Sequence, residues 1–246
     1  MKRFAKQTFF SYAIKVFIGF ASVCLMGMKP ENKRMEPIET KEIIPGIYSI
    51  KDTFVNLFII RDGDGYVAID AGSNPKTIAQ EIKKLKINPD KVEAILLTHT
   101  HPDHIAAIGL FKNARIYLSA NEIGTEDGLK PDKLKLGKET YKNEFSFVKH
   151  QQIIRFKAIS IQAISTPGHT PGSTSYLLNR NYLFVGDAFS LNNGKVDKPN
   201  EAYTKDMKTA IESFENINNL PLVEFIFTAH TGYTSDYKNA VKTELK

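Results

Sequence analysis

Short, mainly apolar runs separated by turn residues predict a hairpin-like series of strands near the start of the folded region. Pro45 and Gly46 open the series, and the turn residues at positions 62–65 separate its last two strands. The expected strands are residues 47–50, 56–60 and 66–70. We therefore expect this part of the chain to begin a β-sheet.

From Pro75 the apolar residues recur at helical spacing. Ile78, Ile82 and Leu85 follow this period, and Asn88 with Pro89 predicts the end of the helix. Beyond it the pattern predicts strands at 92–97, 115–118, 152–156, 158–164, 174–178, 183–186 and 223–228, with helices at 105–111, from about 205, and at 237–245. Strands that alternate with helices predict an α/β sandwich.

The first 29 residues have the pattern of a targeting segment. They contain no acidic residue, residues 16–28 are an uninterrupted apolar and small run, and the basic residues are Lys2, Arg3, Lys6, Lys15 and Lys29. This pattern is typical of a signal peptide. A span over residues 8–28 with Lys15 reaching the interface would instead be a membrane anchor. Residues 21–24 resemble a lipoprotein cleavage box except at Val23.

Three segments are therefore expected. Residues 1–29 are predicted to be a signal peptide or N-terminal membrane anchor, residues 30–43 a polar linker, and residues 44–246 one domain. With either role for the first segment, the protein would be exported or anchored on the outer side of the cytoplasmic membrane. If the leading segment is instead an overlong start that does not direct export, the protein would be cytoplasmic.

Outside the leading segment the chain is nearly neutral. Residues 1–29 hold five of the 33 basic residues, which leaves 28 basic against 27 acidic residues. This balance argues against nucleic acid as a partner, because nucleic-acid binding normally needs a basic surface that displaces counterions. The single cysteine, Cys24, lies in the leading segment, so the remainder can hold no disulfide and no cysteine ligand or nucleophile. We expect a small-molecule substrate, and the oligomeric state stays open.

Three histidines and an aspartate gather directly after the apolar run at residues 94–97. They are His99, His101, Asp103 and His104, and imidazole and carboxylate are common metal ligands. In an extended segment, His99, His101 and Asp103 would point to one side, and His104 would break the alternation. One short segment could therefore serve two neighbouring metal ions.

This run resembles the H-x-H-x-D-H signature of the metallo-β-lactamase superfamily, and three further motifs follow in the family's order. They are Thr166-Pro167-Gly168-His169-Thr170, the apolar strand that ends in Gly186-Asp187, and the last strand before His230. The resemblance covers residues 44–240 and implies a four-layered αβ/βα sandwich that carries one or two metal ions. It makes residues 44–246 a metallo-β-lactamase-like hydrolase domain.

The resemblance also implies a ligand set. His99, His101 and His169 would hold one ion, Asp103, His104 and His230 the other, and Asp187 would bridge both. Two divalent ions are implied, with zinc expected and iron or manganese as alternatives. Asp103 is the candidate to hold the attacking water and to pass its proton to the leaving group. Asp70 either supports a ligand histidine from behind or forms an Asx turn.

Each later motif also has a simpler interpretation. A single histidine after an apolar strand, such as His230, is more often a hydrogen-bonded structural residue. The Pro-Gly sequence around His169 is a good turn on composition alone, and Asp187 could merely end a strand. Five of the six histidines nevertheless fall in the motifs, each after a strand-like run. The sixth, His150, matches no motif and is expected at the surface.

Residues 121–150 fit the alternation least well. They are rich in lysine, glutamate and glycine, and Ser119 with Glu122 fits a capping box. One interpretation is a solvated loop with one helical turn. The other follows from the resemblance, because the corresponding excursion in the family often borders the active site.

The resemblance favours a dinuclear hydrolase of the glyoxalase II-like branch, which would use a metal-activated hydroxide on an ester, thioester or lactone. Asp187 argues against a true β-lactamase, a group that generally lacks this bridging aspartate, whereas the export-like start favours one. A persulfide dioxygenase with one iron ion is a third interpretation. The substrate-binding residues are not predicted, although Phe189 and Tyr233 lie near ligands in the sequence.

Overall fold

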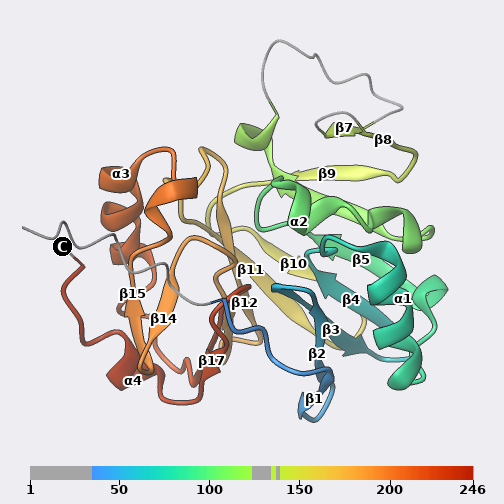
Figure 1. The fold of residues 1–246 in the computed structure, drawn as a ribbon, viewed down its shortest axis with the longest axis horizontal. Coiled ribbons are helices and arrows are strands. Elements are labelled where there is room, and N and C mark those ends of the chain that lie inside the picture. Colours follow the sequence, from blue (N-terminus) through green and yellow to red (C-terminus); the bar gives the residue numbers. More distant parts are fainter. Residues whose placement is uncertain (1–34, 124–133, 137–138, 246) are drawn as a thin grey trace, which may run out of the picture. The chain divides into compact units, whose positions relative to one another are not determined.

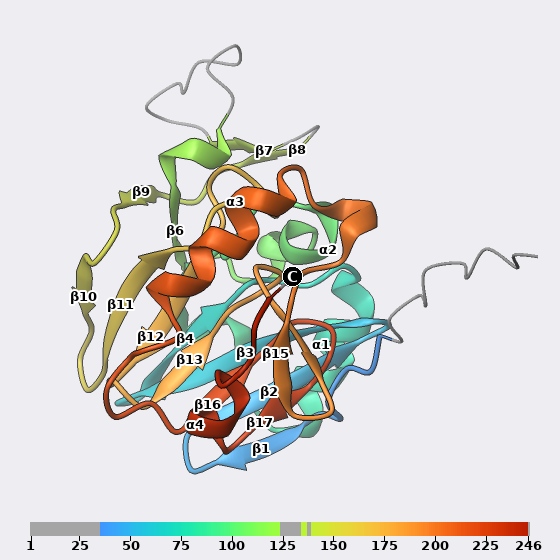
Figure 2. The ribbon, with the colours of Figure 1, turned by 90° about the vertical axis from the view of Figure 1, so that its left-hand side faces the viewer.

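Two β-sheets lie face to face, and helices cover their outer faces (Figure 1, Figure 2). The computed structural model describes residues 35–123, 134–136 and 139–245. The predicted α/β sandwich is confirmed, with its layers in the order helices, sheet, sheet, helices. The predicted targeting segment, residues 1–29, lies outside the described residues. Among the residues that are described, no helix is long and apolar enough to cross a membrane.

The first sheet has seven strands and combines antiparallel and parallel pairs. Its spatial order is β1 (Lys41–Ile44), β2 (Ile47–Asp52), β3 (Val55–Asp62), β4 (Gly65–Ile69), β5 (Val92–Leu96), β6 (Arg115–Ser119) and β9 (Phe145–Val148). The pairs from β1 to β4 are antiparallel, and those from β4 to β9 are parallel. Because β1 begins inside the predicted linker, the folded unit starts before residue 44.

The second sheet has six strands. Its order is β10 (Ile153–Arg155), β11 (Ser160–Ser165), β12 (Thr174–Leu178), β13 (Tyr182–Phe184), β16 (Phe225–Phe227) and β17 (Tyr233–Thr234). The pair β13 and β16 is parallel and the other pairs are antiparallel. Two small hairpins stand apart, β7 (Leu134–Leu136) with β8 (Glu139–Tyr141) and β14 (Ser190–Asn192) with β15 (Lys195–Asp197).

The side-chain alternation of β3 explains why four layers form. Leu57 and Ile59 point to one face of the sheet, where they share a buried cluster with Ile78 of the first helix. Phe58 points to the other face, and its ring lies 5.1 Å from that of Phe184 in the opposite sheet. Both faces of the strand are therefore buried, as its nearly continuous apolar sequence requires.

The helices are short, and side chains cap the starts of several of them. They are α1 (Pro75–Lys84), α2 (Pro102–Ile105), α3 (Met207–Glu212) and α4 (Tyr237–Ala240), with 3-10 turns η1 (Pro89–Lys91), η2 (Ile108–Leu110), η3 (Ala120–Glu122), η5 (Glu201–Tyr203) and η6 (Ser213–Asn216). The side chain of Asn74 accepts hydrogen bonds from the first turn of α1, and Asp206 does the same for α3.

Three predicted elements differ from the structure. The helix at 105–111 is replaced by α2 and η2, which begin at Pro102 because proline favours the first position of a helix. The closing helix is shorter than 237–245 and ends at Ala240. Residues 121–150 are not simply a loop, because strand β9 of this span joins the first sheet. Residues 124–133 and 137–138 of the span lie outside the described part.

The chain segments that carry the candidate ligands meet at one edge of the sandwich. Strands β4 and β5 are parallel, as are β13 and β16, so each pair ends at the same edge of its sheet. The Thr174 N–H donates to the Thr98 carbonyl at 2.8 Å, which joins the two sheets at this edge. Gly186 permits their close approach, because its φ is +55° and a Cβ there would lie 2.5 Å from Thr98 Oγ1.

Candidate metal centre

His99 is held in one orientation by the residues that end β5. Thr98 donates its N–H to Asp70 Oδ1 at 2.7 Å and its hydroxyl to Asp70 Oδ2 at 2.8 Å. Because that hydroxyl hydrogen is used, Nδ1 of His99, at 3.1 Å from Thr98 Oγ1, must be the donor in their contact. The lone pair of His99 is therefore on Nε2, which is buried and has no hydrogen-bond partner.

Asp103 and His104 lie in the first turn of α2 and not in an extended segment. The predicted alternation of His99, His101 and Asp103 therefore ends at Pro102. His104 is fully buried, and its Nδ1 lies 2.9 Å from Asp70 Oδ2. A carboxylate only accepts, so Nδ1 carries a hydrogen and Nε2 faces Asp187 Oδ1 at 3.3 Å.

Asp70 therefore supports two of the candidate ligands. It accepts directly from His104 and, through Thr98, it fixes the tautomer of His99. Such hydrogen bonds orient an imidazole and set which nitrogen can bind a metal. The sequence left two interpretations of Asp70, support of a ligand histidine or an Asx turn. Its contacts fit the first. Its backbone φ is +61°, a conformation that non-glycine residues rarely adopt.

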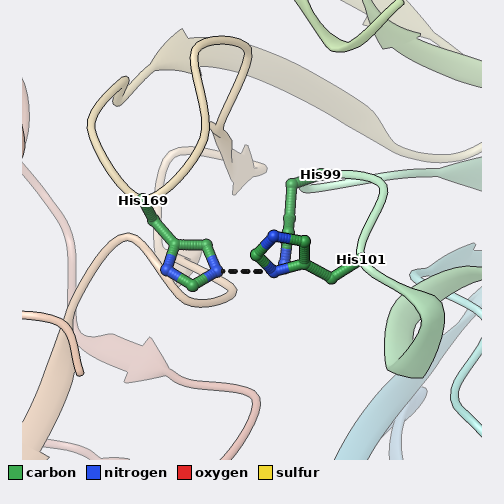
Figure 3. A group of neighbouring side chains, drawn as sticks. All are labelled: His99, His101 and His169. Carbon is green, nitrogen blue, oxygen red and sulfur yellow. Dashed lines mark hydrogen bonds between the residues drawn. The ribbon is translucent and has the colours of Figure 1, made fainter. Parts of the chain in front are cut away.

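His169 comes from the turn between β11 and β12 and faces His101 across the site. Figure 3 shows the rings of His99, His101 and His169 directed toward one another. Nε2 of His169 lies 3.0 Å from Nδ1 of His101. Gly168 holds this turn against α3, because a Cβ on it would lie 2.3 Å from the backbone of Ala210.

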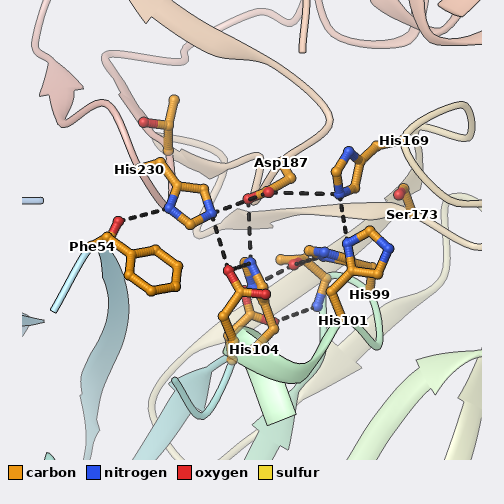
Figure 4. Close-up of polar contacts among 12 residues, drawn as sticks. Phe54, His99, His101, His104, His169, Ser173, Asp187 and His230 are labelled. Carbon is orange, nitrogen blue, oxygen red and sulfur yellow. Dashed lines mark hydrogen bonds and ion pairs between the residues drawn. The ribbon is translucent and has the colours of Figure 1, made fainter. Parts of the chain in front are cut away.

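Asp187 lies between the histidines of the two predicted ion sites (Figure 4). Its Oδ2 lies 3.1 Å from His230 Nε2 and 3.6 Å from His169 Nε2, and its Oδ1 faces His104. His230 is oriented by Phe54, whose carbonyl oxygen lies 2.8 Å from His230 Nδ1. A carbonyl only accepts, so His230 also presents its Nε2 toward the centre.

The structure brings all seven predicted ligand residues together. Their ligand atoms form three groups, each within 4.8 Å: His99 with His101 and His169, Asp103 with His104 and His230, and His99 with His104 and Asp187. The buried atoms His99 Nε2, His104 Nε2 and Asp187 Oδ1 have no hydrogen-bond partner. Buried polar atoms are normally satisfied, so these atoms fit a metal ion between them. His150, by contrast, is exposed, as predicted.

The two histidine groups differ in protonation. Burial lowers the pKa of His99 well below its ordinary value, lowers that of His101, and lowers that of His169 to about 4. These three imidazoles are therefore neutral at pH 7. Burial would also lower the pKa of His104 and of His230, but the charge and hydrogen bonding of Asp187, joined by Asp70 at His104, together outweigh burial and raise both pKa values. In turn, His104 and His230 overcome the effect of burial on Asp187 and hold its pKa well below its ordinary value.

Glu122 connects the two loops that carry His101 and His169, a role that the sequence did not predict. Its Oε2 accepts from the N–H and the hydroxyl of Thr100, both at 2.8 Å. Its Oε1 accepts from the Gly172 N–H at 2.9 Å and from the Thr170 hydroxyl. The predicted capping box is thus wrong, because Ser119 caps only the turn η3 and Glu122 bonds elsewhere. A signal was present, since Glu122 follows β6, which is parallel to β5 and ends at the same edge.

A cavity of about 500 Å³ opens beside the ligand groups. Asp103, Asp187 and His230 line it together with Phe54 and Phe189. Tyr233, the other aromatic residue near a ligand in the sequence, lies outside it, because β17 turns the chain away and the Tyr233 ring stacks on Phe227 at 5.6 Å. Of the residues described in the span 121–150, none lines the cavity.

Replacing Asp70 by asparagine is expected to weaken metal binding about 10- to 100-fold, the usual effect of losing such a supporting group. The new NH₂ group would face Thr98 Oγ1 and His104 Nδ1, so it would favour the tautomer that carries hydrogen on His104 Nε2. The dissociation constants can be measured by competition with a chromophoric chelator. Asp62→Asn is the control, since Asp62 is buried and accepts from Lys157 and Ala158 away from the site. Equal affinities for both variants would contradict the role given to Asp70.

Comparison with known proteins gives a family and a group of relatives. A family model described as the metallo-β-lactamase superfamily matches residues 50–230. The chain is 32% identical over 155 residues to a probable metallo-hydrolase of Methanocaldococcus jannaschii, covering 63% of this chain and 64% of that protein. It is 32% identical over 157 residues to the hydroxyacylglutathione hydrolase of Buchnera aphidicola subsp. Schizaphis graminum, covering 63% and 55%. The chain thus spans less than two thirds of the length of these relatives.

Solved structures share the fold. A B3 metallo-β-lactamase with an active-site glutamic acid superposes with a TM-score of 0.63 at 19% identity, covering 85% of this chain and 86% of that one. A metallo-β-lactamase family protein of Thermus thermophilus gives a TM-score of 0.61 at 19% identity, covering 82% and 78%. The metallo-β-lactamase fold that the sequence motifs implied is therefore confirmed; identities this low show the fold alone.

Proposed function

Because the chain belongs to the metallo-β-lactamase superfamily, we propose that it is a dinuclear metal-dependent hydrolase of an ester, a thioester or a lactone. The observation that carries the proposal is the position of Asp187, with oxygens 3.1 to 3.6 Å from His104, His169 and His230. A carboxylate so placed can bridge two cations. The names of the relatives, a probable metallo-hydrolase and hydroxyacylglutathione hydrolases, support hydrolysis.

His99, His101 and His169 would hold one ion, and Asp103, His104 and His230 the other, with Asp187 shared. We expect divalent zinc, with iron or manganese as alternatives, because imidazole and carboxylate ligands suit all three. Ions bound there would lower the pKa of a water molecule from about 16 to near 7 and polarise the carbonyl group under attack.

Asp103 is the residue best placed to move the proton. Its Oδ2 lies 3.4 Å from His230 Nε2 and 3.6 Å from His104 Nε2, and its side chain is one quarter exposed and lines the cavity. It can accept a hydrogen from the attacking water and donate it to the leaving group, because it reaches both the ligand groups and the open space beside them.

The test combines elemental analysis with a panel of activated ester, thioester, lactone and β-lactam substrates. The proposal expects two zinc ions per chain, turnover of an acyl substrate, loss of turnover with a chelator and recovery with zinc. A strong preference for nitrocefin would favour a β-lactamase, the alternative that the export-like start supports. One iron with no zinc would favour a persulfide dioxygenase. Protein that retains no transition metal after dialysis would overturn the proposal.

Acid is expected to remove the ion held by Asp103, His104 and His230 before the other ion. The raised pKa of His104 and of His230 means that these imidazoles keep their protons to higher pH, so a metal ion must displace them. Each displaced proton weakens the observed affinity about tenfold per unit of pH lowered. His169, with a pKa of about 4, imposes no such competition between pH 5.5 and 7.5. Metal titrations over this range should show the stoichiometry falling from two to one; simultaneous loss of both ions would contradict this order.

The leading segment, residues 1–29, supports a separate proposal of export or membrane attachment. Four of its five basic residues precede an apolar run of 13 residues, 16–28, which is the order found in signal peptides. Fractionation of cells that express the full chain with a C-terminal tag would test it. Signal in the periplasmic, extracellular or membrane fraction is expected, and signal confined to the cytosol would contradict it.

A further inference from the structure

The cavity beside the candidate metal centre is walled mainly by carbon. Phe54 comes from the turn between β2 and β3, Phe189 follows Asp187, and Tyr203 ends η5. Pro102 and Ala106 of the α2 segment, together with Met35 and Pro199, also belong to this wall. Burial of apolar surface is the main source of affinity in pockets of this kind, so the wall fits a ligand with an apolar part.

Apart from that of Tyr203, the side-chain hydroxyl groups on the cavity wall are already engaged with the protein. Ser73 donates its hydroxyl to Asp52 Oδ2 at 2.8 Å. The hydroxyls of Thr228 and Thr231 lie 2.8 Å apart, and Thr231 also accepts from the Leu191 N–H. Outside the ligand groups, the Tyr203 hydroxyl and the Asn200 amide are the main side-chain groups on the described lining that can replace the water around a strongly hydrated substrate.

The described residues that line the cavity include no lysine and no arginine. Besides histidines, their charged members are Asp103 and Asp187, which belong to the ligand groups. The neighbouring Lys198 is not among them and pairs with Glu201 at 2.5 Å. A substrate carboxylate held against the apolar wall, away from ions bound at the ligand groups, would lose its water without meeting a counter-charge from these side chains, which is costly.

Phe54 places this apolar wall next to the reacting centre. Its carbonyl orients His230, and its ring stacks on the His230 imidazole at 5.9 Å with an angle of 15°. Phe54 is 38% exposed and Tyr203 is 61% exposed. Exposed aromatic side chains on a cavity wall are typical of a surface that an apolar ligand covers.

We propose that this site takes neutral substrates whose apolar part lies against Phe54, Phe189 and Tyr203, and that it discriminates against substrates that carry a carboxylate. The proposal rests on the proposed hydrolase function and names its substrate class. It separates this chain's substrate from anionic ones such as β-lactam carboxylates and glutathione thioesters.

The first test uses 4-nitrophenyl esters of straight-chain acids from acetate to octanoate. We expect kcat/KM to rise about three- to fourfold per added methylene until the cavity is filled. The matched anionic substrate is the adipate monoester, whose six-carbon chain ends in a carboxylate. It should react at least about tenfold more slowly than the hexanoate. Equal or faster turnover of the adipate, or no dependence on chain length, would overturn the proposal.

Variants assign the chain-length effect to the wall. Phe54→Ala and Tyr203→Ala should flatten the rise of kcat/KM with chain length. Leu222→Ala is the matched control, because Leu222 is 61% exposed and does not line the cavity. It should leave the rise unchanged. A rise that persists in both aromatic variants would contradict binding against these rings.

A binding measurement separates this inference from the proposed function. N-phenyl-1-naphthylamine is neutral, and 8-anilinonaphthalene-1-sulfonate has the same rings with one sulfonate. The neutral probe should bind more tightly than the sulfonated probe, both to metal-free and to zinc-loaded protein. Phe54→Ala should weaken binding of the neutral probe. If the neutral probe is preferred but no acyl substrate is hydrolysed, the hydrolase proposal fails and the apolar site stands. If hydrolysis is seen and the anionic probe and substrate are preferred, this inference alone fails.

Discussion

An Asp187→Asn protein is expected to lose one of the two proposed metal ions and at least about 10²- to 10³-fold in kcat/KM, the loss typical when a group that stabilises the reacting charge is removed. Asp187 is the carboxylate that contacts histidines of both predicted ion sites among the described residues. Asparagine keeps the size of the side chain but has one acceptor oxygen and no charge. It can therefore serve one ion at most.

The measurements are metal content per chain, kcat and KM for the best acyl substrate, and thermal unfolding. Asp64→Asn is the control, because Asp64 is an exposed aspartate that pairs with Lys157 far from the site in the fold. Its metal content and kcat/KM should be those of the unchanged protein. If Asp187→Asn kept two ions and full activity while folding normally, Asp187 would not be a bridging ligand.

The meeting of the candidate site residues could be predicted from the sequence because several of them follow a strand that its own apolar residues identify. Asp70 follows β4, His99 follows β5 and Asp187 follows β13. Parallel neighbours end at one sheet edge, so the local strand pattern together with the motifs was enough to bring distant residues together. The same applies to the layers, since the alternation of Leu57 and Phe58 already indicates a strand buried on both faces.

Contacts between distant loops could not be read from local spacing in the sequence. Ser119 and Glu122 satisfy the spacing of a capping box, yet Glu122 finds stronger partners in Thr100 and Gly172, 22 and 50 residues away. Local spacing cannot reveal such partners, because tertiary contacts override local preferences. The turn to α2 was missed for a different reason, since the extended interpretation gave no weight to Pro102 as a helix start.

The cavity wall was also beyond sequence reasoning. Phe54 reaches His230 across 176 positions, and its ring is placed by the turn after β2, not by any motif. Tyr233 lies only three residues from His230, but β17 pairs with β16 and carries its ring away from the cavity. Closeness in sequence to a ligand was thus a poor guide to the substrate site, whereas the direction of the strand decided it.

Replacing Glu122 by alanine is expected to weaken binding of the ion at His99, His101 and His169 about 10- to 100-fold and to lower kcat more than it changes KM. The Glu122 carboxylate accepts four hydrogen bonds, two from Thr100 and two from the loop that follows His169. Each hydrogen bond to a charged group contributes about 1.5–3 kcal/mol, less here because Glu122 is only partly buried and water can enter. Without them the two loops can separate, and the angle between the His101 and His169 rings is no longer fixed.

The matched variants separate this positioning role from a general loss of stability. Glu122→Gln can accept at one loop, but its NH₂ group faces donors at the other, so it should give an intermediate affinity. Glu144→Ala removes an exposed glutamate that pairs with Arg115, and it should leave affinity unchanged. The absorption spectrum of cobalt bound at His99, His101 and His169 reports ligand geometry independently of activity. This spectrum should change in Glu122→Ala and not in Glu144→Ala. A group that fixes the loops of His101 and His169 cannot be removed without altering the ion that these residues hold. If Glu122→Ala therefore lowered only the unfolding temperature and left the cobalt spectrum and the metal affinity intact, Glu122 would support the fold and not the ligands.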